Sequence, residues 1–373
     1  MKVSGCASSP ARSGTASPGN TVRSRAVALL LILACCVARP SLADPARAPE
    51  RPSGVTAADL AVVINLSDPL SEAIGSYYVD ARHIPATNVV RVRFDSQRDD
   101  LPVAQFTAIQ QSMDEQAGKH VQAIALTWAR PYRVGCMSIT SAFAFGFDAK
   151  YCANGCLRTQ QSPYYNSPTT RPYDELHMRP TMALAAADFD EAKALIDRGV
   201  RADRMFPRGT AYFVSTTDTA RNVRAPEYPP AALAAKNRIG VEIVHGAGIR
   251  DRKDVLFYFT GSIGVPELDS NRFVPGAIAD HLTSFGGMLT DSSQMSSLRW
   301  LEAGATGSYG TVVEPCAFPG KFPDVRIVTQ RYLAGETLLE AYWKSVAMPG
   351  QGIFIGDPLT TPFRSGTRAD PAR

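Results

Sequence analysis

The stretch DLAVVINLSDPLSEAIGSYYVDARHIPATNVVRVRF, residues 59–94, determines the fold class. Its opening apolar run predicts a buried strand over 59–65. A turn follows, in which Ser67 or Asp68 can cap a helix that has Pro69 at an early position. The run VVRVRF (89–94) predicts the next strand. Because a strand–helix–strand crossover favours parallel pairing, this unit indicates an α/β sheet.

The same alternation continues along the chain. Further strands are predicted at 121–128, 209–216, 241–246, 254–261, 286–290, 305–313 and 351–359. Helices are predicted at 102–117, from about Asp188, and at 229–240, 276–285, 296–304 and 336–346. Strands that alternate with helices over such a length predict a three-layer α/β sandwich with a mostly parallel sheet covered on both faces.

The N-terminus has the pattern of a secretory signal peptide. Arg23 and Arg25 precede an apolar run of 13 residues, which is too short to span a bilayer, and small residues follow in SLA. We therefore predict a signal peptide at 1–43 and an exported, periplasmic or extracellular protein without a transmembrane segment after cleavage. A lipoprotein anchor through Cys35 in ILAC is the alternative.

The remaining chain divides by composition. Residues 44–57 are polar and proline-rich and predict a flexible linker. Residues 58–365 predict a single α/β domain, and 366–373 predict a disordered tail. Within the domain, 129–180 is a cysteine- and aromatic-rich insertion with no clear helix or strand, which we expect to form an ordered excursion beside the sheet.

The charge balance argues against a nucleic-acid partner. The full chain has 39 basic and 35 acidic residues, but residues 1–43 contain five basic residues and no acidic one. The mature chain would therefore have 34 basic and 35 acidic residues, which leaves no basic excess for a phosphate backbone.

Four cysteines lie outside the predicted signal peptide: Cys136, Cys152, Cys156 and Cys316. Export to an oxidising compartment and an even count predict disulfides. Sequence alone does not choose among the three pairings of four cysteines. We favour a bond between Cys136 and Cys316, which would attach the excursion to the sheet.

The blocks 61–90, HLTSFGG (281–287), AGATGSYGTVVEPC (303–316) and IGDPL (355–359) resemble a family of exported bacterial proteins that has no established activity. A more distant similarity is to the gingipain-type cysteine peptidases, which have a caspase-like fold. It is carried by FYFTGSIG (257–264), GATGSYGTVV (304–313) and IFIGDPL (353–359), in the same order.

This resemblance implies the fold and not the peptidase activity. The peptidase histidine falls on Ser262 in this chain. The nucleophilic cysteine would end the next strand, which we place near GGMLTDSS, where Thr290, Asp291 and Ser292 stand instead. The likeness therefore implies a caspase/gingipain-like protein without the catalytic dyad.

A rearranged catalytic site is the alternative. Cys316 could act as a nucleophile with His281, which lies 35 residues earlier, if the two meet in the fold. Glu314 could act as acid or base beside them. The structural alternatives are a disulfide for Cys316 and a hydrogen-bonded helix-end residue for His281.

Ligands of open α/β sheets bind at the carboxyl ends of strands. We expect a cleft there that includes Asp68, Arg130, Ser262 and Asp291, although Asp68 can equally be a helix cap. No P-loop or dinucleotide fingerprint is present and the histidines are too few for a zinc site, so we predict neither cofactor nor metal. The predicted function is binding of a peptide, protein or glycan at the cell envelope; the alternative is a hydrolase that uses His281, Cys316 and Glu314.

Overall fold

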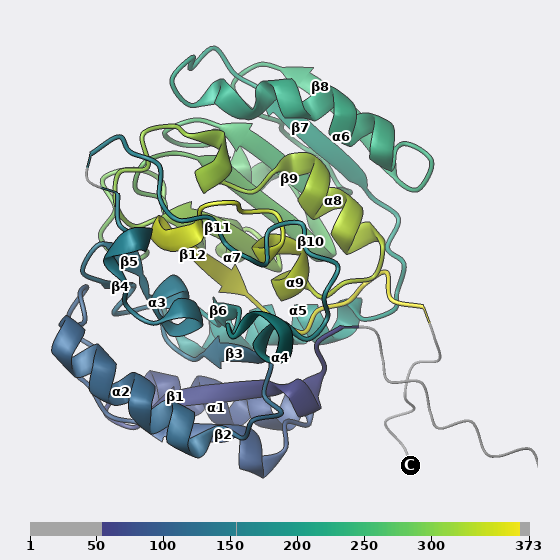
Figure 1. Ribbon diagram of the computed structural model, residues 1–373. Helices are drawn as coiled ribbons and strands as arrows, with labels where there is room; N and C mark the ends of the chain where they lie inside the picture. Colours follow the sequence, from purple (N-terminus) through teal and green to yellow (C-terminus); the bar gives the residue numbers. More distant parts are fainter. Residues whose placement is uncertain (1–53, 154, 366–373) are drawn as a thin grey trace, which may run out of the picture. The chain divides into compact units, whose positions relative to one another are not determined.

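The computed structural model describes residues 54–153 and 155–365, which form an α/β sandwich (Figure 1). The predicted signal peptide, all but the last residues of the predicted linker, and the predicted C-terminal tail lie outside the described residues. Across the described ranges, no helix combines the length and apolarity needed to cross a membrane.

The main sheet has ten strands in the order β2-β1-β3-β6-β12-β11-β10-β9-β7-β8, and all neighbours are parallel except the antiparallel pair β11 and β12. The strands are β1 (Leu60–Asn65), β2 (Val89–Val92), β3 (Ala123–Leu126), β6 (Thr181–Ala183), β7 (Thr210–Ser215), β8 (Gly240–His245), β9 (Val255–Gly261), β10 (Phe273–Leu282), β11 (Gly307–Thr311) and β12 (Gly352–Gly356). The helices are α1 (Pro69–Arg82), α2 (Val103–Gln116), α3 (Ile139–Phe145), α4 (Pro172–Leu176), α5 (Phe189–Ala202), α6 (Tyr228–Ala235), α7 (Leu298–Glu302), α8 (Val325–Leu333) and α9 (Leu338–Trp343).

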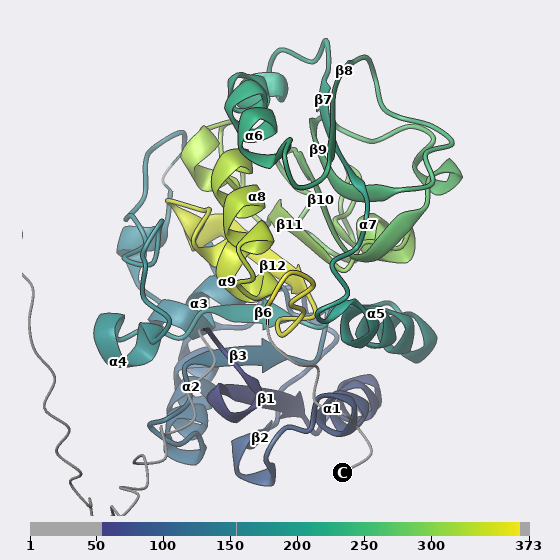
Figure 2. The same cartoon turned by 90° about the vertical axis from the view of Figure 1, so that its right-hand side faces the viewer.

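Helices cover both faces of the sheet. Figure 2 shows α6 and α8 on one side of β9 and β10, and α7 on the other. Apolar side chains of α1, α6, α8 and α9 belong to one core cluster, whereas those of α2 and α7 belong to the others. Neighbouring residues of one strand enter different clusters, as Val62 and Val63 do, because successive side chains point to opposite faces. The predicted three-layer sandwich with a mostly parallel sheet is confirmed.

The local start signals of the helices act as predicted. Asp68 is the N-cap of α1 and its carboxylate accepts the backbone N–H of Leu70, while Pro69 occupies the first helical position. Asp188 caps α5 in the same way. These short-range signals need only neighbouring residues, so the sequence suffices to locate them.

Several predicted elements are wrong. The segment 276–285, predicted as a helix, belongs largely to strand β10, and 286–290, predicted as a strand, forms turns. β10 lies between β9 and β11 and is buried on both faces, so its sequence lacks the alternation of a half-buried strand. The sequence also missed β6 and α8.

The insertion 129–180 contains more regular structure than predicted. It holds the hairpin of β4 (Arg133–Val134) and β5 (Met137–Ser138), followed by α3 and α4. Each element has seven residues or fewer, which is too short to produce a recognisable periodicity.

A buried carboxylate connects the two ends of the fold. Asp357, in the residue after β12, accepts hydrogen bonds from the Tyr78 hydroxyl and from Arg82 Nε of α1, at 2.8 and 3.0 Å. Arg82 also pairs with Asp203, which follows α5. Asp357 is fully buried, so the guanidinium of Arg82 has little water to replace this partner.

We expect Asp357→Ala to lower the free energy of unfolding by about 3–5 kcal/mol, because removal of one partner leaves a buried charge uncompensated. The matched control is Asp269→Ala, which removes an exposed carboxylate 3.2 Å from Arg299 and should cost less than about 1 kcal/mol. Urea denaturation of both variants measures the difference. Equal costs would show that the buried cluster adds nothing beyond a surface ion pair.

Candidate functional site

The carboxyl end of β11 carries the residues that the sequence singled out. The chain leaves β11 and reaches Glu314, an exposed residue whose side chain accepts the backbone N–H of Cys316 at 2.7 Å. Cys316 and Ala317 both have left-handed backbone conformations, with φ of 58° and 50°. Two consecutive non-glycine residues in this region are unfavourable and must be held by their surroundings. Glu314 therefore serves to cap a strained turn.

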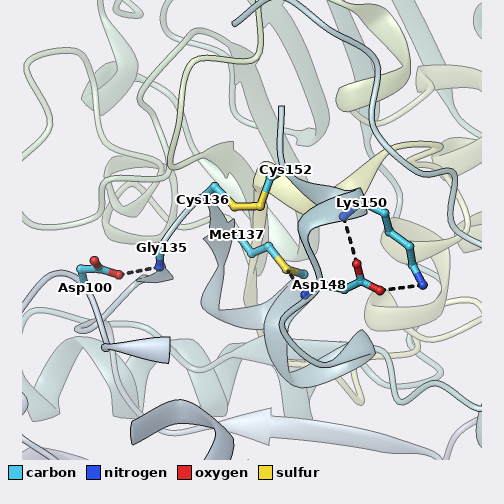
Figure 3. Close-up of a disulfide and its surroundings, with 7 residues drawn as sticks. All are labelled: Asp100, Gly135, Cys136, Met137, Asp148, Lys150 and Cys152. Carbon is cyan, nitrogen blue, oxygen red and sulfur yellow. Dashed lines mark hydrogen bonds and ion pairs between the residues drawn. A yellow bond between two sulfur atoms is a disulfide. The ribbon is translucent and has the colours of Figure 1, made fainter. Parts of the chain in front are cut away.

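The four cysteines form two disulfides, as predicted. Cys136 bonds to Cys152 within the insertion, beside Met137 and the ion pair of Asp148 with Lys150 (Figure 3). Cys156 bonds to Cys316 across 160 residues of sequence.

The favoured bond between Cys136 and Cys316 is therefore wrong. The insertion is attached to the end of β11, but Cys156 makes the attachment, and Cys152 bonds to Cys136 instead. Cys316 has no free thiol in this arrangement.

His281 lies inside β10 and not at a helix end, so that prediction is also wrong. Its Nδ1 accepts the indole N–H of Trp300 at 2.9 Å, and its Nε2 donates to the carbonyl of Met295 at 3.1 Å. Burial lowers the pKa of His281 to about 4, so the imidazole is neutral near pH 7. Both ring nitrogens are used, which leaves none to activate a nucleophile.

The predicted cleft residues are held by local contacts. Asp68 caps α1, as the alternative interpretation proposed. Ser262, which follows β9, donates its hydroxyl to the carbonyl of Gly264 at 2.6 Å. Neither contact brings these side chains toward one another.

Arg130, after β3, and Asp291, after β10, are each held by a separate contact. Arg130 forms an ion pair with Asp99 at 2.7 Å, and Asp291 accepts the hydroxyl of Tyr132 at 2.8 Å. Burial and this hydrogen bond raise the pKa of Tyr132, so its hydroxyl remains protonated. Arg130 and Asp291 therefore have different partners, Asp99 and Tyr132.

Lys321 is the ionisable residue that sequence reasoning missed at this edge. It is fully buried, and its Nζ has no hydrogen-bond partner among the described residues. Burial lowers the pKa of Lys321 to about 8, against the opposing effect of Glu314. The ammonium lies 5.2 Å from the ring centre of Phe318. The loop sequence FPGKFP contains no signal that this lysine is buried.

Comparison with known proteins adds little. No family model matches the chain, and no curated protein matches it. Among solved structures, one described as "Structure of Protease" aligns with a TM-score of 0.41 and 10% identity, over 85% of this chain and 81% of that one. A similarity at this level says nothing about activity.

We expect the state of His281 to give stability a specific pH dependence. The ordinary pKa is 6.5 and the folded value is about 4, so below pH 6.5 the unfolded chain binds a proton that the folded chain does not. The free energy of unfolding should fall by on the order of 3 kcal/mol between pH 6.5 and 4 from this group.

The test compares unfolding of the wild type with His281→Gln, whose amide can keep one acceptor and one donor, over this pH range. Burial raises the pKa of Glu227 to about 7, so this group makes the free energy of unfolding rise as the pH falls. Because Glu227 is present in both proteins, its contribution cancels in the difference between them. A difference that does not change with pH would mean that His281 titrates in the folded state as it does in the unfolded chain.

Proposed function

We propose that this chain is an exported binding protein that uses the loops at the carboxyl end of β11, and that it is not a cysteine hydrolase. One observation carries the proposal: both groups that a Cys/His pair needs are already occupied. The sulfur of Cys316 is bonded to Cys156, and both nitrogens of His281 are hydrogen-bonded in the core.

The similarity to gingipain-type peptidases supports the same conclusion. The strand beside β9 is β10, which ends at Leu282, so Thr283 and Ser284 take the place that we had assigned to the segment near residue 290. Neither is a cysteine, and Ser262 stands at the histidine position. The IGDPL block has a structural use here, since Asp357 accepts a hydrogen bond from Arg82. We infer a caspase/gingipain-like fold that lacks the dyad.

We further propose export through the signal peptide at 1–43, with 58–365 as one domain and 129–180 as its insertion. Two disulfides are compatible with an oxidising compartment. A peptide, protein or glycan of the cell envelope would contact the loops at the Cys156–Cys316 bond. Leu157, next to Cys156, has 58% of its surface exposed, and the carboxylate-bearing Glu314 is two residues from Cys316. An apolar group beside an acidic one suits an amphipathic partner.

The decisive experiment counts thiols and measures peptide hydrolysis on the same secreted protein. Without reductant, the denatured mature chain should contain no alkylatable cysteine, and a broad peptide library should remain uncleaved. Cys316→Ser should leave that result unchanged and release one thiol, on Cys156. Cys136→Ser is the matched control, because it opens the other disulfide and should release only the thiol of Cys152.

The hydrolase alternative makes the opposite prediction. It requires that the Cys156–Cys316 disulfide is reduced and that His281 gives up its hydrogen bonds to Trp300 and to the carbonyl of Met295. A free Cys316 in the native protein, together with cleavage that Cys316→Ser abolishes and Cys136→Ser does not, would replace the binding proposal with that alternative.

A further inference from the structure

A polar pocket lies at the amino ends of β3 and β6. It has a volume of about 300 Å³ and is enclosed by α2, the end of α3, and α4 with the residues after it. Its polar lining consists of Gln110, Asp114, Tyr173, His177 and Arg179. Ligand pockets for small molecules begin at about this size.

Arg179 forms the base of the pocket. Its side chain is only 7% exposed, and Nη1 donates to the carboxylate of Asp114 at 2.7 Å. Nε donates to the carbonyl of Val121, and the guanidinium carbon lies 3.5 Å from the ring centre of Tyr173. Nη2 makes no hydrogen bond to any residue that the structure describes. The Nη2 donor of this nearly buried guanidinium therefore remains available to a ligand.

The negatively charged side chain of Asp114 lies beside Arg179 in the same pocket. Asp114 uses one carboxylate oxygen for Arg179, and 48% of its side chain is exposed. The second oxygen makes no bond to the described protein. A simple anion bound to Arg179 would be repelled by Asp114, and a simple cation bound to Asp114 would be repelled by Arg179. The two groups are best matched by a ligand that carries both charges.

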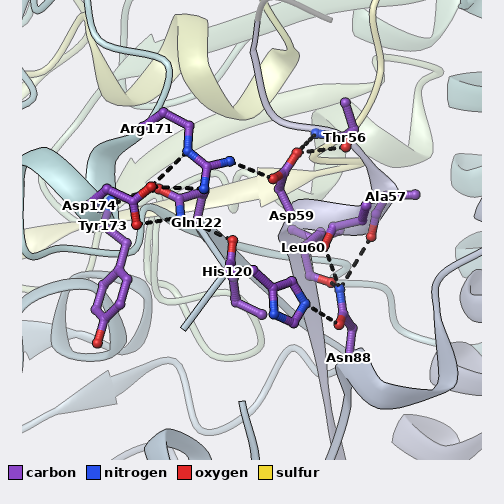
Figure 4. A network of polar contacts seen from close by, with 12 residues as sticks. Thr56, Ala57, Asp59, Leu60, Asn88, His120, Gln122, Arg171, Tyr173 and Asp174 are labelled. Carbon is purple, nitrogen blue, oxygen red and sulfur yellow. Dashed lines mark hydrogen bonds and ion pairs between the residues drawn. The ribbon is translucent and has the colours of Figure 1, made fainter. Parts of the chain in front are cut away.

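The wall that contains Tyr173 is fixed by a separate network. Figure 4 shows Arg171 between Asp59 and Asp174, and the side chain of Gln122 beside the start of α4. The backbone N–H of Tyr173 donates to Gln122 at 3.1 Å. α4 is thus attached to the amino ends of β1 and β3, so its residues keep their place without a ligand.

We propose that this pocket binds a free amino acid. The carboxylate of the ligand accepts from Nη2 of Arg179, and its ammonium donates to the free oxygen of Asp114. Gln110 supplies an amide and His177 an imidazole at the rim. This inference is independent of the binding proposed at the Cys156–Cys316 bond, since none of the residues that line the pocket belongs to that bond or is Glu314.

The experiment is calorimetric titration of the mature protein with the twenty proteinogenic L-amino acids, followed by two analogues of the strongest binder. One analogue lacks the ammonium and the other lacks the carboxylate. Each should bind about tenfold or more weakly, because each loses a charge-assisted hydrogen bond.

The substitution Asp114→Asn tests the contribution of the ligand's ammonium separately from that of its carboxylate. It should weaken the amino acid about tenfold while the analogue without the ammonium binds at least as well as to the wild type, since the repulsion is gone. Glu115→Gln makes the same change in charge one residue along α2 and should alter neither affinity. Thermal unfolding of both variants confirms that they are folded.

The proposal fails if no amino acid binds, if the analogue without the ammonium binds the wild type as tightly as the amino acid does, or if Asp114→Asn and Glu115→Gln have equal effects. Activity or thiol content at the end of β11 does not enter any of these measurements. Failure here therefore leaves the proposed function as it was.

Discussion

The carboxylate of Asp357 holds the first helix to the last strand. It receives hydrogen bonds from Tyr78 and Arg82, which stand some 275 residues earlier in the chain. β12 is antiparallel to β11 but parallel to β6, so its last residue lies at the edge where β11 begins and β6 ends. A buried carboxylate there is tolerable only because the guanidinium and the hydroxyl replace its lost hydration.

A second buried ion pair follows the same principle in the other half of the sheet. Arg224 donates to Asp280 of β10 at 2.6 Å, and both side chains are 1% exposed. The remaining guanidinium contacts are the carbonyls of Thr260 and Pro323. These polar groups occupy the sites where a sheet buried on both faces would otherwise contain only apolar residues. They stabilise specific neighbours across the sheet.

The predicted site residues and the pocket residues differ in what they leave unused. The predicted residues that follow β1 and β11 cap a helix, close a turn or form a disulfide. At the start of β6, Arg179 and Asp114 satisfy each other only in part, inside a cavity. The sequence directed attention to the carboxyl ends of the strands because open α/β sheets bind ligands there. It contained no pattern for Arg179, since the partners of this residue come from α2, α4 and the segment before β3.

The sequence by itself determined the fold class, the helix start at Asp68 and the formation of disulfides, because these depend on local periodicity, on neighbouring residues and on cysteine number. It failed for β10, where burial on both faces removes the alternation that identifies a strand. Only the tertiary structure decided that Cys156 is the partner of Cys316, that His281 is neutral, and that Arg179 lines a pocket. Each of these properties depends on contacts between residues far apart in the chain, and such contacts exist only once the sheet has brought them together.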